Sequence, residues 1–303
     1  MSDDDRAALL RAMPWVFVAI WSTGFVVARF GMPHAPPFGF LAWRFGLSVL
    51  LFVVWVAASG ARWPQGRAQW WHLAVTGALL QAGYLGGVWS AVKAGLGAGT
   101  AALIVGLQPV LTALWVTAAG SEQRIAPRQW LGLVLGLGGL LLVVGHKLGQ
   151  GEVSAANLAM AVAALASITV GTLYQKRFVA PCDVRSANAA QLLSALLLTL
   201  PLALWFEHEP LRWHPELIGA MAWSVLGLTL GGSSLLYLLI QRGAATRVSS
   251  LMYLVPPCTA VLAWVLFDES LGGGVVPGLA LSAVGVWLVV RGPRARVEPA
   301  AAP

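Results

Sequence analysis

The residues of this 303-residue chain that could do chemistry are sparse polar and aromatic side chains set within long apolar runs. Arg44 is the one charge well inside such a run. A guanidinium at that depth needs an anion or water as its partner. It could bind the carboxylate of a solute or support a gate. Alternatively, its long side chain could extend to the membrane interface. The candidate binding residues are Trp21, Ser22, Arg44, Gln81, Tyr84, Trp89, Gln108, Ser167, Thr169, Ser233, Tyr237 and Tyr253.

Buried hydroxyl, amide and phenol groups need hydrogen-bond partners, so each candidate either bonds a neighbouring helix or faces a solute. Gln81 and Tyr84 share a helical face, and Ser233 and Tyr237 lie four residues apart. Apart from Arg44, the candidates occupy six separate apolar runs, which a shared cavity explains. They predict a solute-binding site.

Motifs for catalysis or cofactor binding are missing from the sequence. It has no GxxxxGK[ST] phosphate loop and no HExxH pair. All five histidines fall at the ends of apolar runs or in loops, and Glu207-His208-Glu209 reads as a solvated loop. Cys182 and Cys258 are too few for a metal cage or a disulfide framework. We expect no enzyme, no cofactor and no metal site.

The elements that must position the candidates are membrane-spanning helices. The chain is 58% hydrophobic and 10% charged, and its apolar runs match the roughly 20 residues that cross a bilayer. Backbone groups in lipid must be satisfied within the segment, so the runs predict an all-α polytopic protein. The ten expected spans are Met13–Gly31, Phe38–Ala58, Trp70–Ser90, Gly97–Thr117, Pro127–Gly145, Asn157–Tyr174, Ala189–Trp205, Leu217–Leu239, Arg247–Phe267 and Val275–Val290.

Basic residues in the loops predict the orientation. With the N-terminus in the cytoplasm, 14 lysine and arginine residues fall on the cytoplasmic side and 4 on the other. The positive-inside rule then places both termini in the cytoplasm. The net charge of +7 follows from this bias and is spread over several loops, so we expect no nucleic-acid partner.

The chain also repeats itself at a spacing of 147 residues. Gly24 returns as Gly171, Pro109 as Pro256 and Glu122 as Glu269. An odd number of spans per copy inverts the second copy in the membrane, which predicts two inverted five-helix repeats around a central site. The expected parts are a cytoplasmic segment at 1–12, repeats at 13–146 and 154–291, and a cytoplasmic tail at 292–303.

Prolines and small residues mark positions where these helices should bend or approach closely. Pro109 and the pair Pro256 and Pro257 lie in mid-span, where a missing amide donor should kink the helix, so we assign them to gating or to a static kink. Small faces at Gly132–Gly136 and Gly278–Ser282 predict close helix packing, either within the chain or in a dimer.

These features together resemble the EamA family of the drug/metabolite transporter superfamily. The resemblance rests on Ala19–Phe25, on Trp43-Arg44-Phe45, and on two blocks that run from a proline to Glu122 and to Glu269, each followed by a glycine-rich span. It covers about residues 13–291. It departs from the usual Gly-Glu ending at Ser121 and Asp268.

The resemblance implies a secondary transporter, an exporter or exchanger of small metabolites such as aromatic amino acids, in a bacterial inner membrane. Alternating access around a central cavity would move the solute, with lipid as the surroundings and a monomer or homodimer as the assembly. Since no acidic residue lies in mid-span, we expect uniport or exchange rather than proton coupling. Two alternatives are a lipid flippase or channel, and a membrane-embedded transferase using Glu122 with Arg124 or Asp268 with Glu269.

Overall fold

The computed structural model describes residues 3–118, 127–148, 151–235 and 254–290, and all regular structure in these ranges is helical. This confirms the all-α class for the described part of the chain. The helices are α1 (Asp3–Gly31), α2 (Pro37–Ser59), α3 (Arg67–Gly77), η1 (Ala78–Gly83), α4 (Tyr84–Lys93), α5 (Ala98–Val105), α6 (Gln108–Ala118), α7 (Pro127–Leu148), α8 (Ala155–Phe178), α9 (Val184–Phe206), α10 (Pro215–Ala222), η2 (Trp223–Gly232), α13 (Val255–Phe267) and α14 (Val275–Val290).

Six of the described helices are long and apolar enough to cross a membrane. They are Ala12–Gly31, Pro37–Ser59, Pro127–Leu148, Ala155–Phe178, Val184–Phe206 and Pro215–Leu235, and shorter apolar helices cover Ala98–Thr112, Val255–Phe267 and Val275–Leu288. Many of their large apolar side chains face outward, among them Trp43, Trp115 and Trp264. In a protein surrounded by lipid such faces need no further cover.

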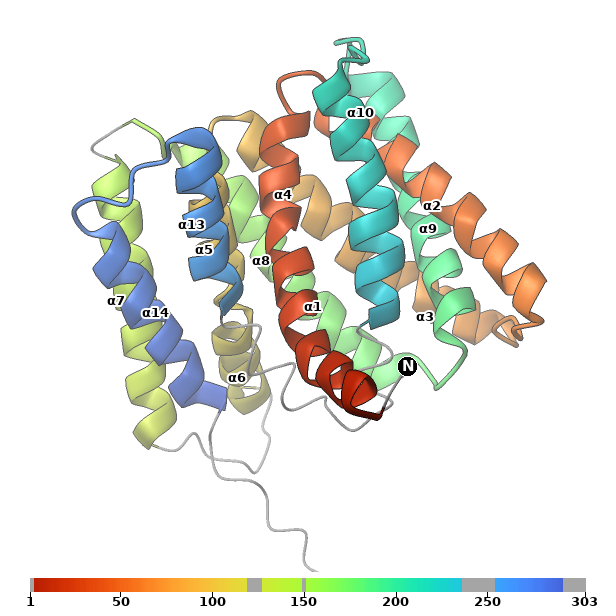
Figure 1. The fold of residues 1–303 in the computed structure, drawn as a ribbon, viewed down its shortest axis with the longest axis horizontal. Helices are drawn as coiled ribbons and strands as arrows, with labels where there is room; N and C mark the ends of the chain where they lie inside the picture. The colour runs from red at the N-terminus through yellow and green to blue at the C-terminus, as the bar shows by residue number, and fades with distance from the viewer. Residues whose placement is uncertain (1–2, 119–126, 149–150, 236–253, 291–303) are drawn as a thin grey trace, which may run out of the picture.

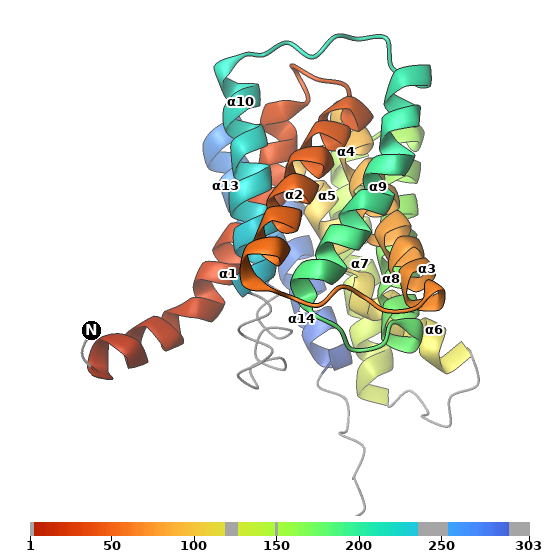
Figure 2. The ribbon, with the colours of Figure 1, turned by 90° about the vertical axis from the view of Figure 1, so that its right-hand side faces the viewer.

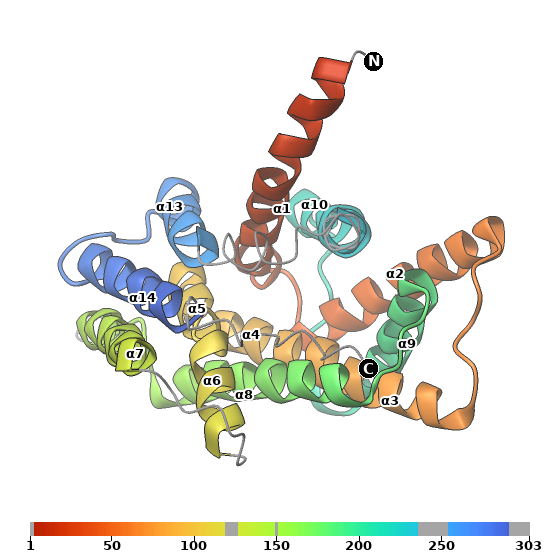
Figure 3. The ribbon, with the colours of Figure 1, turned by 90° about the horizontal axis from the view of Figure 1, so that it is seen from below.

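The helices run up and down as one bundle (Figure 1). Connections 32–36, 207–214 and 268–274 lie at its upper end in this view, and connections 60–66 and 179–183 lie at its lower end with the start of α1 (Figures 1 and 2). Helices α2 and α9 pack along one side of the bundle, whereas α7 and α14 form a pair at the other (Figure 3).

Small residues hold α7 against α14. A Cβ atom added at Gly139 would lie 2.4 Å from the carbonyl oxygen of Gly278, and one at Gly285 would lie 2.4 Å from the backbone nitrogen of Gly136. The Ser282 hydroxyl donates to the Gly136 carbonyl oxygen at 3.2 Å. The two small faces predicted from the sequence therefore pack against each other within the chain, because only glycine lets the backbones come so close.

Several helices depart from the expected spans, the eighth among them because η2 interrupts it. The first begins at Asp3, ten residues before the expected Met13, with Pro14 inside it. The third runs from Arg67 to Lys93 and is interrupted by the π-helical segment η1. The fourth is broken between α5 and α6, so Pro109 stands in the first turn of a new helix rather than at a kink in a continuous one. Hydropathy predicts the length of an apolar run, but it does not predict π-helical segments or breaks within the run.

Candidate substrate-binding site

Two π-helical segments occupy equivalent positions in the two halves of the chain. Shifted by 147 residues, Ala78–Gly83 of η1 falls on residues 225–230, inside η2. A π-helix bonds each amide to the carbonyl five residues back, which changes the faces that its side chains present, and such segments are frequent at functional sites. η1 of the first half packs against α9 of the second, and η2 of the second half packs against α2 of the first. The two π segments therefore form two equivalent junctions between the halves.

The junction of α2 with η2 buries a positive charge. Arg44 of α2 is only 7% exposed, and its Nη2 and Nε donate to the Thr229 hydroxyl of η2 at 3.2 and 3.4 Å. That hydroxyl donates in turn to the Ser224 carbonyl oxygen at 2.8 Å, five residues back, as the π pitch allows. No ion pair found among the described residues includes Arg44. Within the described residues its guanidinium therefore has one neutral hydrogen-bond partner, the Thr229 hydroxyl, and unused donors.

Two more hydroxyls at this junction lack partners. The Ser48 and Ser224 Oγ atoms are buried and make no hydrogen bond in the part of the chain that the structure describes. Ser48 lies one helical turn from Arg44 on α2. Tyr84, 9% exposed, lies near enough to Arg44 for an electrostatic interaction. We call Arg44, Ser48, Tyr84, Ser224 and Thr229 the polar junction.

The equivalent junction of α9 with η1 is filled by backbone. Gln191, 6% exposed, stands where Arg44 stands in the first half, and Ala195, Gly77 and Ala82 replace Ser48, Ser224 and Thr229. A Cβ atom added at Gly77 would lie 2.2 Å from the Gln191 carbonyl oxygen. The helices touch where the first junction holds polar side chains, so this second site, the packed junction, has no space for a solute.

The predicted gating residue Pro256 packs against the break between α5 and α6. Gly106, in the break between α5 and α6, would place a Cβ atom 2.7 Å from Pro256 Cγ. A recess of about 270 Å³, its open mouth included, is lined there by Gly106, Leu107, Pro256 and Pro257, with Leu103 and residues of α14 beside them. Pro109 lies in the first turn of α6, after this break, and Pro256 and Pro257 lie in the first turn of α13 rather than in mid-helix. The structure thus brings Pro256 against the break that precedes Pro109, and the gating role of these prolines remains a prediction.

Several predicted binding residues serve helix packing in the structure. Ser22 and Thr169 donate to the carbonyls of Val18 and Leu165, four residues back in their own helices. Trp89 stacks on Phe40 with ring centroids 4.4 Å apart. The alternative to solute binding predicted from the sequence was a hydrogen bond to a neighbouring helix, whereas Ser22 and Thr169 bond their own helices and Trp89 stacks on a ring.

Other predicted residues bond polar groups on neighbouring helices. The Ser167 hydroxyl donates to the Leu79 carbonyl oxygen of η1 at 2.8 Å. Gln108 Nε2 donates to the Thr172 hydroxyl at 2.9 Å, which ties α6 to α8. The first of these bonds satisfies a carbonyl within the π segment.

Five predicted residues remain to be placed. Trp21 is half-buried, and its ring centroid lies 5.3 Å from that of Phe17. Gln81 and Ser233 are half-buried in η1 and just after η2. Tyr237 and Tyr253 lie outside the described residues.

Two carboxylates at the upper end cap the start of α5. Glu269 accepts from the backbone amides of Ala98 and Gly99 at 2.8 and 3.3 Å, and Glu152 accepts from that of Gly97 at 2.9 Å. Lys147, 2% exposed, places its Nζ 2.8 Å from Glu152. Carboxylates suit a helix N-terminus. Glu269, a candidate group for the transferase alternative, is thus engaged as a helix cap.

Sequence reasoning missed part of the polar junction and a cluster of histidines. The spacing of four between Arg44 and Ser48 was visible as one helix face. The pairing with Ser224 and Thr229 was not, because it depends on the π pitch of η2 and on a contact across 185 residues. The cluster of His34 with His214 and Glu216 depends on loops 182 residues apart. The sequence shows that these histidines lie in loops, but it does not show that the two loops lie side by side.

The comparisons with known proteins point to one class. Residues 12–145 and 156–291 each match the model of the EamA-like transporter family. The transporter YvbV of Bacillus subtilis is 24% identical over 289 residues, covering 94% of this chain and 91% of that protein. A probable amino-acid metabolite efflux pump of Salmonella typhimurium is 24% identical over 288 residues, covering 92% of this chain and 94% of the pump.

Two further matches agree. The inner membrane transporter YedA of Escherichia coli K12 is 26% identical over 272 residues, which is 88% of this chain and 84% of that protein. A solved crystal structure has the same fold, with a TM-score of 0.64 at 22% identity, covering 91% of this chain and 94% of the other. Because the family model matches both halves over most of its length, the chain belongs to the EamA-like transporter family.

Proposed function

We propose that this protein is a secondary transporter of small organic metabolites that carry a carboxylate, amino acids among them, and that Arg44 binds the carboxylate. The observation that carries the proposal is the buried Arg44 with one hydroxyl partner. An uncompensated buried charge is costly, by several kcal/mol. A solute carboxylate between α2 and η2 would compensate it through charge-assisted hydrogen bonds.

The surroundings of Arg44 support a polar solute group. The unpartnered Ser48 and Ser224 hydroxyls could each donate or accept one hydrogen bond. Tyr84 adds an aromatic face with a polar tip. The name of the Salmonella relative, a probable amino-acid metabolite efflux pump, agrees with a carboxylate-bearing solute.

The mechanism that we infer is alternating access by two inverted five-helix repeats, with ten spans in all. The 147-residue spacing, the paired π segments and the contact of Pro256 with the break between α5 and α6 support it. Helices α1 and α8, equivalent in the spacing, run in opposite directions in the bundle (Figure 1). Gly106 and Pro256 would then be the point about which the halves move, with the remaining predicted binding residues along the path.

Efflux from a bacterial inner membrane follows from the names of relatives and from the positive-inside bias, with both termini in the cytoplasm. We keep uniport or exchange as the energetic mode, because Glu152 and Glu269 lie at a helix end and not in mid-span. Flux into proteoliposomes with and without a pH gradient tests the mode. Strict dependence on the gradient would contradict it.

Counterflow tests the function itself. The purified protein is first screened for metabolites that raise its melting temperature, since a ligand of the folded state stabilises it. Each stabilising solute is then loaded into proteoliposomes, and uptake of its labelled form is followed. We expect saturable counterflow that stops when the internal solute is omitted. Stabilising solutes that never exchange would contradict a transporter, and a steady ionic conductance would indicate a channel.

A further inference from the structure

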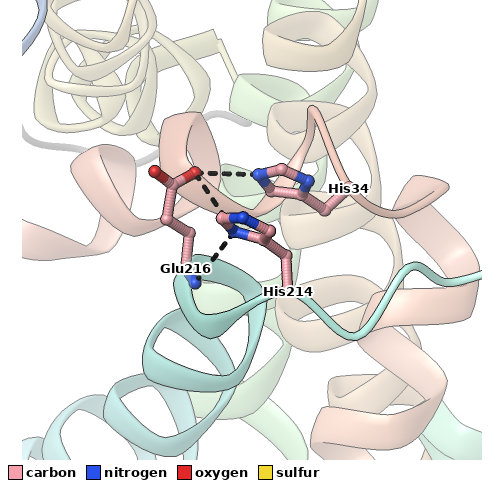
Figure 4. A group of neighbouring side chains, drawn as sticks. All are labelled: His34, His214 and Glu216. Carbon is pink, nitrogen blue, oxygen red and sulfur yellow. Dashed lines mark hydrogen bonds and ion pairs between the residues drawn. The ribbon is translucent and has the colours of Figure 1, made fainter.

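Two histidines and a glutamate from distant parts of the chain meet at the upper end of the bundle (Figure 4). His34 lies in the connection between α1 and α2, whereas His214 and Glu216 lie at the start of α10. The Glu216 Oε2 is 2.8 Å from His34 Nε2 and 4.0 Å from His214 Nδ1. One carboxylate oxygen thus faces both imidazoles.

The backbone around the cluster is held in place by other contacts. The Arg212 amide donates to the His34 carbonyl oxygen at 2.9 Å, which joins the two connections directly. Lys93 Nζ donates to the Met32 carbonyl oxygen at 3.0 Å and to Glu209 Oε2 at 2.7 Å, so it bridges the same two segments. The cluster is therefore preorganised by bonds that do not use its own side chains.

The side chains are partly accessible, and the contacts of His214 Nδ1 are long. The His34 side chain is 21% exposed, and those of His214 and Glu216 are 53% and 52% exposed. The two imidazoles stack with centroids 4.6 Å apart and 11° between their planes. His214 Nδ1 accepts from the Glu216 amide at 3.5 Å, the outer limit of a hydrogen bond. Its lone pair is available to another partner.

We propose that His34, His214 and Glu216 bind a divalent transition-metal ion, with Zn²⁺ as the best match. Two imidazoles and a carboxylate are its preferred ligands, with bonds of about 2.0–2.2 Å that set tetrahedral ligand atoms about 3.3 Å apart. All three ligand atoms already lie within 4.8 Å of one another. Small side-chain movements complete the geometry, and water takes the fourth position.

Metal binding would join the α1–α2 connection to the start of α10. His34 belongs to the first half of the chain and His214 to the second, so the ion would link the two halves at one end. If the proposed transport holds, this link slows it by keeping the upper end closed. The binding claim does not depend on transport.

The test uses the full-length purified protein in detergent, without a polyhistidine tag. Zn²⁺ is titrated by calorimetry, and Co²⁺ in its place reports the geometry by its visible absorption. The variants are His34→Ala, His214→Ala and Glu216→Gln. His208→Ala, an exposed histidine of the same connection outside the cluster, is the matched control. Melting temperatures without metal confirm that each variant is folded.

We expect one Zn²⁺ per wild-type chain, a Co²⁺ spectrum typical of tetrahedral coordination, and a melting temperature raised by about 2–4 °C at saturation. Each cluster variant should weaken binding at least tenfold, and His208→Ala should leave it unchanged. No binding to the wild type, or equal binding by wild type and His34→Ala, would overturn the proposal. Neither result depends on whether a solute is transported, so the metal site and the proposed function can fail separately.

Discussion

The polar junction and the packed junction are the same piece of architecture built twice with different side chains. In the first, α2 meets η2 around Arg44 and three hydroxyl residues, Ser48, Ser224 and Thr229. In the second, α9 meets η1 with Gln191 against the backbone of Gly77. Both keep a π segment at the equivalent position.

The difference separates scaffold from site. A duplicated chain must keep what sets the backbone path, such as the two π segments. It is free to change side chains where a solute with two unlike ends needs an asymmetric cavity. The polar junction holds buried hydroxyls without hydrogen-bond partners among the described residues, whereas the packed junction closes by backbone contact at Gly77.

The largest effect on stability is expected when a glycine of the packed junction is replaced by the residue at the equivalent position of the polar junction. Gly77→Ser introduces a Cβ atom 2.2 Å from the Gln191 carbonyl oxygen, and backbone cannot move aside cheaply. We expect a loss of about 3 kcal/mol in the free energy of unfolding, or failure to accumulate in the membrane. The reciprocal Ser224→Gly should change the free energy of unfolding by less than about 1 kcal/mol, because the helix-propensity cost of glycine is offset by removal of a buried hydroxyl that has no partner among the described residues. Equal melting temperatures for the two variants would contradict the contrast.

An intermediate effect of opposite sign is expected at Ser48. Its buried hydroxyl has no partner among the described residues, so Ser48→Ala removes an unsatisfied polar group. We expect the free energy of unfolding to rise by about 1 kcal/mol, while the stabilisation by a bound solute falls. Denaturation with and without ligand measures both. Ala195→Ser, the equivalent change in the packed junction, should instead destabilise, and a stabilising result there would show that the junctions do not differ.

The smallest effect is expected at the helix starts that position the junctions. α9 is capped by Asp183, whose side chain accepts from the Arg185 amide at 2.9 Å. At the equivalent position α2 has Pro36, and Glu207 from a distant loop accepts from the Phe38 and Gly39 amides instead. Asp183→Ala should cost about 0.5–1 kcal/mol at neutral pH.

The two caps should respond differently to acid. The hydrogen bond from Arg185 lowers the pKa of Asp183, so its contribution is complete above the unfolded-state pKa and is lost as the pH falls through the lower, folded value. Burial raises the pKa of Glu207, so ionisation of this group disfavours the fold as the pH rises. Melting curves of wild type and Asp183→Ala should converge in acid. A constant difference at every pH would contradict the assignment.

Much of the scaffold could be predicted from the sequence, because apolar runs, the proline pair and the small faces of α7 and α14 leave direct marks. The interior of the site could not. Arg44 was visible as an intramembrane charge, yet its hydroxyl partner depends on the π pitch of η2. Ser22 and Thr169 have the right types for a cavity but bond their own helices, and only coordinates distinguish these cases.

The central claim is that Arg44 binds the carboxylate of the transported solute. The most direct measurement is counterflow of an exchanged acid and of its uncharged amide, compared in wild type, Arg44→Met and Gln191→Met. We expect wild type and Gln191→Met to prefer the acid by at least tenfold, since hydrogen bonds to charged groups contribute about 1.5–3 kcal/mol. Arg44→Met should lose this preference while remaining folded. An unchanged preference for the acid in Arg44→Met would contradict the account.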